Sequence, residues 1–250
     1  MYKYYTLFLF SLCVMRVAMS ENVIKIGAAT IQQPTNKLTA FEHRDNIFIK
    51  DQASKVTQLT SSGKNREPLI SPDGKKLVFI RKSNRKADLP IGGEENYPGD
   101  KILADQIWIV DLKTGKEKCL VSDEDKRPHE EGIKPYGAFM SYLCFSTDGS
   151  KLYFLASAAP VTSHLYVVDI RTQKARFFMC ANSCEVIYTG KYKNHLMVDT
   201  HEYFLGCGSY DFLWLVDENG IKIGAIAAEG GNYNYQLETF KDSCDATTSY

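Results

Sequence analysis

LISPDGKKLVFI, residues 69–80, and CFSTDGSKLYFL, residues 144–155, are two near-copies of one pattern, 75 residues apart. In each copy a polar turn separates a short apolar run from an alternating one. The aspartate of such a turn accepts hydrogen bonds from backbone amides, and the glycine takes the left-handed conformation that closes it. Each copy therefore predicts a β-hairpin. The turn residues are Ser71, Asp73 and Gly74 in the first copy, and Ser146, Asp148 and Gly149 in the second.

A second pattern follows each hairpin. QIWIVD, residues 106–111, and HLYVVD, residues 164–169, each lead through a polar turn into a further strand, and weaker copies occur at residues 46–51 and 212–217. The repeating unit is thus four short antiparallel strands, which is typical of a propeller blade. We predict an all-β fold, a β-propeller of four-stranded antiparallel blades. We count four blades, with five as the alternative, and expect a strand at residues 233–237 that could complete the first blade.

These repeats resemble a known class. LTSSGKNREPLISPDGKKLVFIRK (residues 59–82) with DQIWIVDLKTGKEKCL (residues 105–120) is similar to the TolB-type (WD-repeat-like) β-propeller repeat, and the next copy is similar as far as residue 178. The resemblance implies a propeller but no single activity. Such repeats occur in the periplasmic TolB protein, in propellers of prolyl-oligopeptidase-type peptidases and in some sugar-acid lyases. Propellers of this class usually have six or more blades, so four is a departure.

The first twenty residues differ from the rest of the chain. A basic start, an apolar run and the small residues Ala18 and Ser20 form the pattern of a secretory signal peptide. We expect a signal peptide at residues 1–20, a propeller domain at 21–241 and a flexible tail at 242–250. No other stretch could span a membrane, so the mature chain would be periplasmic or secreted.

The net charge of the chain indicates which classes of binding partner to expect. Lys plus Arg and Asp plus Glu each number 30, so the formal charge is zero. Binding to nucleic acid needs a net positive surface, and we therefore expect no nucleic-acid partner. The partners that we expect are another protein of the cell envelope or a glycan.

Six cysteines would remain after removal of the signal peptide. An even number in an exported protein permits disulfides. Cys180 and Cys184 are the one closely spaced pair and could staple a loop. The alternative is that the cysteines are buried or singly paired, and the sequence does not decide the pairing.

The stretch that looks most like an active site is HLMVDTHEY, residues 195–203. On a strand, His195, Asp199 and His201 would share one face and could hold a metal ion. The resemblance to histidine-using lyases of this repeat class makes a metal-assisted polysaccharide lyase or hydrolase the alternative function. The simpler interpretation is a polar strand face. We assign no catalytic residue and no cofactor, since the chain has no nucleophile elbow and no phosphate-binding glycine loop.

Two polar segments remain. The insertion at residues 83–104 lengthens the first copy, and long loops on a rigid scaffold often carry recognition, so its central residues are candidate binding residues. These are Glu94, Glu95, Asn96 and Tyr97. SDEDKRPHEEG, residues 122–132, is interpreted as a solvated loop between blades. The sequence as a whole favours an exported, non-enzymatic binding module of the cell envelope.

Overall fold

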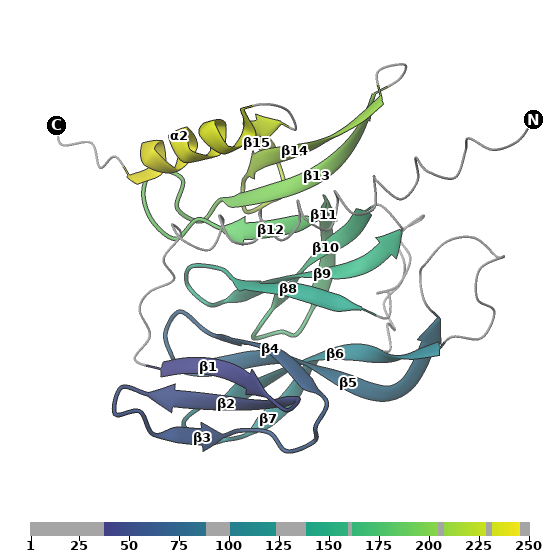
Figure 1. The fold of residues 1–250 in the computed structure, drawn as a ribbon, viewed down its shortest axis with the longest axis vertical. Helices are drawn as coiled ribbons and strands as arrows, with labels where there is room; N and C mark the ends of the chain where they lie inside the picture. The colour runs from purple at the N-terminus through teal and green to yellow at the C-terminus, as the bar shows by residue number, and fades with distance from the viewer. Residues whose placement is uncertain are drawn as a thin grey trace, which may run out of the picture. The chain divides into compact units, whose positions relative to one another are not determined.

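The structure is a computed structural model that describes residues 38–88, 101–123, 139–159, 162–204, 208–228 and 232–245. These residues form four antiparallel sheets and one α-helix (Figure 1). Within every sheet the strands lie side by side in chain order. This arrangement of four successive sheets confirms the predicted four-bladed β-propeller in a nearly all-β chain, although the first blade has three strands among the described residues where four are predicted.

The bounds of the elements are as follows. The first sheet has three strands, β1 (Leu38–His43), β2 (Asn46–Asp51) and β3 (Val56–Gln58). The second has β4 (Asn65–Ile70), β5 (Lys76–Asp88), β6 (Lys101–Asp111) and β7 (Glu117–Val121). The third has β8 (Met140–Phe145), β9 (Lys151–Ala159), β10 (Thr162–Asp169) and β11 (Ala175–Ala181). The fourth has β12 (Ser183–Val186), β13 (Leu196–Phe204), β14 (Gly208–Val216) and β15 (Lys222–Ala228), and helix α2 (Tyr233–Asp245) follows.

The two repeated turns connect β4 to β5 and β8 to β9. In the first, Ser71 Oγ donates to Asp73 Oδ1 (2.6 Å) and the backbone amide of Lys75 donates to the same oxygen (3.0 Å). The second repeats this network around Asp148. Gly149 has φ of 70°, and a Cβ built on it would lie 3.5 Å from Pro72 Cδ of the other turn. The two turns therefore lie against each other, where consecutive sheets meet.

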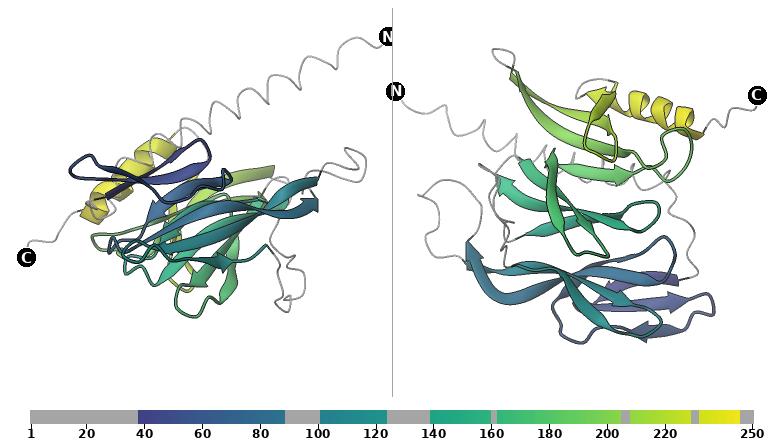
Figure 2. Two further views of the ribbon diagram at one scale, coloured as in Figure 1. Left: turned by 90° about the horizontal axis from the view of Figure 1, so that it is seen from below. Right: turned by 180° about the vertical axis from the view of Figure 1, so that it is seen from behind.

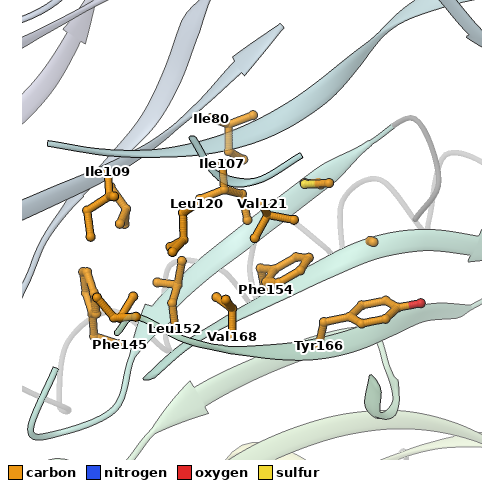
Figure 3. Packing of buried hydrophobic residues seen from close by; sticks show 14 residues of the cluster. Ile80, Ile107, Ile109, Leu120, Val121, Phe145, Leu152, Phe154, Tyr166 and Val168 are labelled. Carbon is orange, nitrogen blue, oxygen red and sulfur yellow. The ribbon is translucent and has the colours of Figure 1, made fainter. Parts of the chain in front are cut away.

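The main hydrophobic core lies between the second and third sheets (Figure 3). Ile80 and Ile107 contribute to it from the second sheet, while Leu152 and Phe154 contribute from the third. The alternate residues of β5 point the other way, and Phe79 belongs to a second cluster that the first sheet shares. Because both faces of the second sheet are covered, its two central strands carry continuous apolar runs, residues 77–80 of β5 and 107–110 of β6.

Strands β4 and β8, the first strands of the second and third sheets, carry the same irregularity. Glu67 in β4 and Tyr142 in β8, again 75 residues apart, have φ of 51° and 52°. The pairing register shifts at each of these positions. A bulge of this kind bends a strand and increases its twist. The repeat thus extends to the backbone geometry, beyond the turns that the sequence shows.

The C-terminal segment corrects one expectation. A strand was predicted at residues 233–237, but these residues begin α2, which lies beside β15 (Figures 1 and 2). Tyr233, Tyr235 and Leu237 alternate as in a strand, yet Leu237 and Lys241 are buried while Tyr235 is 74% exposed. The burial follows the helical spacing of four residues. The helix continues to Asp245, and residues 246–250 of the predicted tail lie outside the described residues.

Helix α2 lies near acidic groups of the fourth sheet. Burial, together with the carboxylates of Asp199 and Asp211, raises the pKa of Tyr233 to about 12. Burial raises the pKa of Glu185 on β12 to about 7, and the positive charge of Lys241 on α2 only partly opposes this rise. Glu185 is half-buried, and loss of hydration disfavours its charged form relative to the protonated carboxyl.

The left-handed backbone at Gly149 gives a test of the repeated turn. We expect Gly149→Ala to lower the free energy of unfolding by about 1–2 kcal/mol, because a Cβ disfavours this conformation. Gly224→Ala is the matched control. Gly224 lies in β15 without a positive φ, and its Cβ would meet nothing within 4 Å. Urea unfolding of both variants measures the difference, and equal losses would contradict the assignment.

The raised pKa of Glu185 gives a second test. A carboxyl whose pKa rises from 4.5 to about 7 on folding favours the folded state below pH 4.5, and this stabilisation is lost as the pH rises through 7. We expect the free energy of unfolding to fall by roughly 3 kcal/mol across this window. Glu185→Gln should flatten the profile and stabilise the protein at pH 8. The exposed Glu218→Gln variant should keep the slope of the unmodified chain, and an unaltered slope in Glu185→Gln would refute the account.

Candidate recognition site

The longest strand pair of the second sheet forms an arm. The predicted insertion at residues 83–104 begins and ends as strand, since β5 continues to Asp88 and β6 starts at Lys101. Lys86 pairs with Leu103 after a shift of register, and Asp88 pairs with Lys101. We call residues 83–88 and 101–104 the arm. It continues beyond the rest of the second sheet (Figure 1).

Glu94, Glu95, Asn96 and Tyr97, the candidate binding residues, lie outside the described residues. In sequence they fall between the two strands of the arm.

A buried carboxylate anchors one side of the arm. The side chain of Asp105 on β6 is fully buried, and its two oxygens lie 2.8 and 2.7 Å from the two terminal nitrogens of Arg66 on β4. Lys82 Nζ lies 2.9 Å from Asp105 Oδ1. The backbone amide of Met140 donates to Asp105 Oδ2 (2.8 Å), and the carbonyl of Met140 accepts from Arg66 (2.7 Å). These bonds join the base of the arm to the first strand of the third sheet.

A second carboxylate anchors the other side. Asp123 follows β7, and its side chain is 7% exposed. Ser83 Oγ donates to Asp123 Oδ2 (2.8 Å), Arg85 Nε donates to the same oxygen (3.1 Å), and Gln106 Nε2 donates to Oδ1 (2.6 Å). Burial opposes ionisation of Asp123, but these hydrogen bonds outweigh it and lower the pKa of the carboxyl. Asp123 therefore ties the β5 strand of the arm, and β6 just beyond the arm, to the end of β7.

Neither anchor is predicted from the sequence. The sequence pattern indicates a solvated loop at residues 122–132, which include Asp123, and no local motif marks Asp105. The sequence does contain one signal for the buried ion pair, because the two copies of the repeat differ at the positions of both of its charged residues. Arg66 and Asp105 of the first copy are replaced by Ser141 and Ser163 in the second, so both charges of the pair change together.

The exposed side chains at the base of the arm are mostly basic. Asn84, Arg85 and Lys86 are exposed, and Lys64 Nζ donates to Asn84 Oδ1 (3.0 Å). Of these cations, Arg85 is ion-paired with Asp123. The base of the arm thus presents positive charge together with hydrogen-bond donors, which suits an acidic partner surface.

The proposed metal ligands are placed as follows. Asp199 and His201 lie on β13, two residues apart, and His195 directly precedes this strand. His201 Nδ1 lies 2.6 Å from Asp211 Oδ1 on β14, while the ring of His195 packs edge-on against Tyr192. No group of three or more His, Cys, Asp or Glu side chains within the described parts of the chain is arranged to hold a metal ion. The structure thus pairs His201 with Asp211, and does not show the three candidates as one cluster.

The fourth sheet carries a row of aromatic side chains. Tyr210, Phe212 and Trp214 alternate along β14, and the rings of Phe212 and Trp214 stack with their centres 5.7 Å apart. Lys222 Nζ lies 4.5 Å from the centre of the Trp214 ring. Tyr210 is 43% exposed. The exposed Tyr210 and the half-buried Phe212 and Trp214 form a second candidate binding surface, since aromatic side chains are enriched in protein interfaces.

Cys119, Cys144, Cys180 and Cys184 are free thiols in the structure. Cys180 is exposed on β11, and Cys184 is buried on β12 with its Sγ 3.1 Å from Cys144 Sγ. The Cys180–Cys184 bond stays a prediction, and the sulfur contact that the structure shows is a different one.

The buried ion pair of the arm is directly testable. We expect Asp105→Asn to lower the free energy of unfolding by about 3 kcal/mol, because the charges of Arg66 and Lys82 lose their buried partner. Glu117→Gln breaks a matched pair in the same sheet, since Glu117 lies 2.9 Å from Arg81 with both side chains partly exposed. That control should cost about 1 kcal/mol or less. Denaturant unfolding of the two variants compares them, and similar losses would show that Asp105 is not an anchor.

The known proteins to which this chain is similar are solved structures that resemble it in fold. No protein family matches the chain, and neither does any curated protein. The tricorn protease superposes with a TM-score of 0.51 at 16% identity, over 76% of this chain and 16% of that one. The Porphyromonas gingivalis dipeptidyl peptidase 4 gives 0.49 at 15% identity, over 78% and 31%. The β-propeller domain of the Trilobed protease from Pyrococcus furiosus gives 0.48 at 15% identity, over 76% and 54%.

The chain therefore spans 16% to 54% of the length of these structures. At such low identity the similarity to the tricorn protease concerns the fold alone and leaves the activity open.

Proposed function

We propose that the chain is an exported, non-enzymatic β-propeller that binds another protein of the cell envelope through the arm. The observation that carries this proposal is the arm itself, a two-stranded extension whose base is held by Asp105 and Asp123. A scaffold that fixes a protruding segment in this way lowers the entropy that ordering it would cost on binding.

The edges of the arm favour a protein partner. The pairing of β4 with β5 ends at Arg81, and the pairing of β6 with β7 begins at Ile107. Among the described residues no strand pairs with the outer edges of the arm at Lys86–Asp88 or Lys101–Leu103. An open strand edge offers backbone donors and acceptors to an incoming strand, and exposed basic side chains nearby would attract an acidic one.

Export supports the assignment to the envelope. The signal-like residues 1–20 lie outside the described residues, and the proposal of a periplasmic or secreted protein rests on their sequence pattern. None of the described residues belongs to a helix that is long and apolar enough to cross a membrane.

The test is a crosslinking pull-down from an envelope extract of the source organism, with the full chain and two variants as bait. The arm variant replaces residues 86–103 with a two-residue Asn-Gly turn, which is suited to a tight hairpin and keeps Ser83, Arg85 and Asp105. The matched control is Tyr210→Ser, which alters the aromatic row and leaves the arm intact. Circular dichroism and thermal unfolding establish that both variants are folded.

We expect a protein partner that the full chain and Tyr210→Ser both capture and that the arm variant loses. Its affinity for the arm variant, measured with purified proteins, should fall at least about tenfold, equivalent to about 1.4 kcal/mol. A partner that all three baits retain equally would overturn the role of the arm. Binding to envelope glycans with no protein partner would overturn the choice of a protein.

A further inference from the structure

Two cysteines from different sheets meet between the third and fourth sheets. Cys144 lies on β8 and Cys184 on β12, which are the first strands of their sheets and contact each other. Their Sγ atoms are 3.1 Å apart, although 40 residues separate them in sequence. A disulfide holds its sulfur atoms about 2.05 Å apart, so a movement of about 1 Å would join them.

The neighbouring side chains hold the two strands together. Tyr188, which follows β12, donates a hydrogen bond from its hydroxyl to the carbonyl of Phe145 (2.8 Å), the residue after Cys144. Phe145 is fully buried, and Tyr188 is 8% exposed. The contact between the thiols thus lies beside a second, independent link between the same two sheets. A short side-chain movement can close the bond without moving either strand far.

Cys119 and Cys180 have other surroundings. The thiol of Cys119 donates to the carbonyl of Val121 in its own sheet (3.3 Å). Cys180 is exposed on β11, the last strand of the third sheet. Cys180 and Cys184 are close in sequence but lie on opposite sides of the connection between the third and fourth sheets.

We propose that Cys144 and Cys184 form a disulfide that joins the third and fourth sheets in the mature protein. The oxidant is a low-molecular-weight disulfide such as glutathione disulfide. One cysteine thiolate attacks a sulfur of glutathione disulfide and displaces one glutathione thiolate. The second cysteine thiolate then attacks the mixed disulfide and displaces the other, so the two thiols lose two protons and two electrons, which leave as two molecules of glutathione.

The local environment determines when this bond can form. The hydrogen-bonding contact with Cys184 and burial together raise the pKa of the Cys144 thiol well above its usual value. Because the thiolate is the nucleophile, exchange at this site is slow once the sheets have packed. The bond would therefore form while the chain folds, and after folding it would resist small reductants.

Peptide mapping tests the pairing directly. The full chain is refolded with a mixture of glutathione and glutathione disulfide, free thiols are alkylated, and the protein is digested with trypsin. Trypsin releases Cys144 in residues 127–151, while Cys180 and Cys184 leave together in residues 177–191. A bond from Cys144 thus links two peptides, whereas a Cys180–Cys184 bond lies within one peptide.

We expect the two peptides to be linked in the unmodified chain and in Cys180→Ser, and to be unlinked in Cys184→Ser. The Cys180→Ser variant is needed because the tryptic peptide alone does not separate Cys180 from Cys184. A Cys180–Cys184 bond, or recovery of Cys144 and Cys184 alkylated from the folded, oxidised protein, would overturn the proposal.

Thermal unfolding gives a second measurement. Closing a loop of this length should raise the Tm of the oxidised chain by roughly 10 °C relative to the reduced chain. The same difference should appear in Cys180→Ser and vanish in the Cys144→Ser/Cys184→Ser double variant. No difference between the oxidised and reduced forms of Cys180→Ser would contradict a bond between these sheets, even if the double variant failed to fold.

Discussion

The burial of both faces of each interior sheet is the constraint on which the rest of the structure depends. On β5, Val78 and Ile80 pack toward the third sheet, while Leu77 and Phe79 pack toward the first. A single sheet of this composition would expose one apolar face to water, which is unfavourable in proportion to its area. The units must therefore stack, and each repeated turn lies where two of them meet. Any function is consequently carried by segments that extend from the sheets, by strand edges, or by the outer faces of the stack.

The fold was largely predictable from the sequence because its signals are local. A turn of Ser, Asp and Gly between two apolar runs specifies a hairpin wherever it occurs, and its repetition specifies the stack. The prediction failed at Tyr233–Leu237, where an alternation of aromatic and polar residues is compatible with either period. Over such a short segment the choice depends on which residues find a neighbour to pack against, and the contact of α2 with β15 settles it.

The candidate site was less predictable, because its contacts are not local. Asp105 and Arg66 are 39 residues apart, and no local sequence pattern around either residue predicts contact with the other. The same holds for Cys144 and Cys184, whose sulfur contact depends on how two sheets pack. From the sequence alone, Cys180 is a candidate disulfide partner of Cys184 only because the two are close in the chain. The Arg66–Asp105 pair can be read from the two copies of the repeat, because both residues become serine, Ser141 and Ser163, in the second copy.

Helix α2 also bears on how such a chain can lengthen in evolution. Repeat proteins grow by duplication, and each added unit needs an apolar surface on which to stack. Beside β15 this surface is in contact with a helix that buries Leu237 and Lys241, so a duplicated unit inserted after β15 would have to displace it. Lengthening the β5–β6 hairpin requires no such displacement, because the added residues would extend away from the contacts between sheets. Divergence within this architecture is therefore easier by elongating a hairpin than by adding a blade next to the helix.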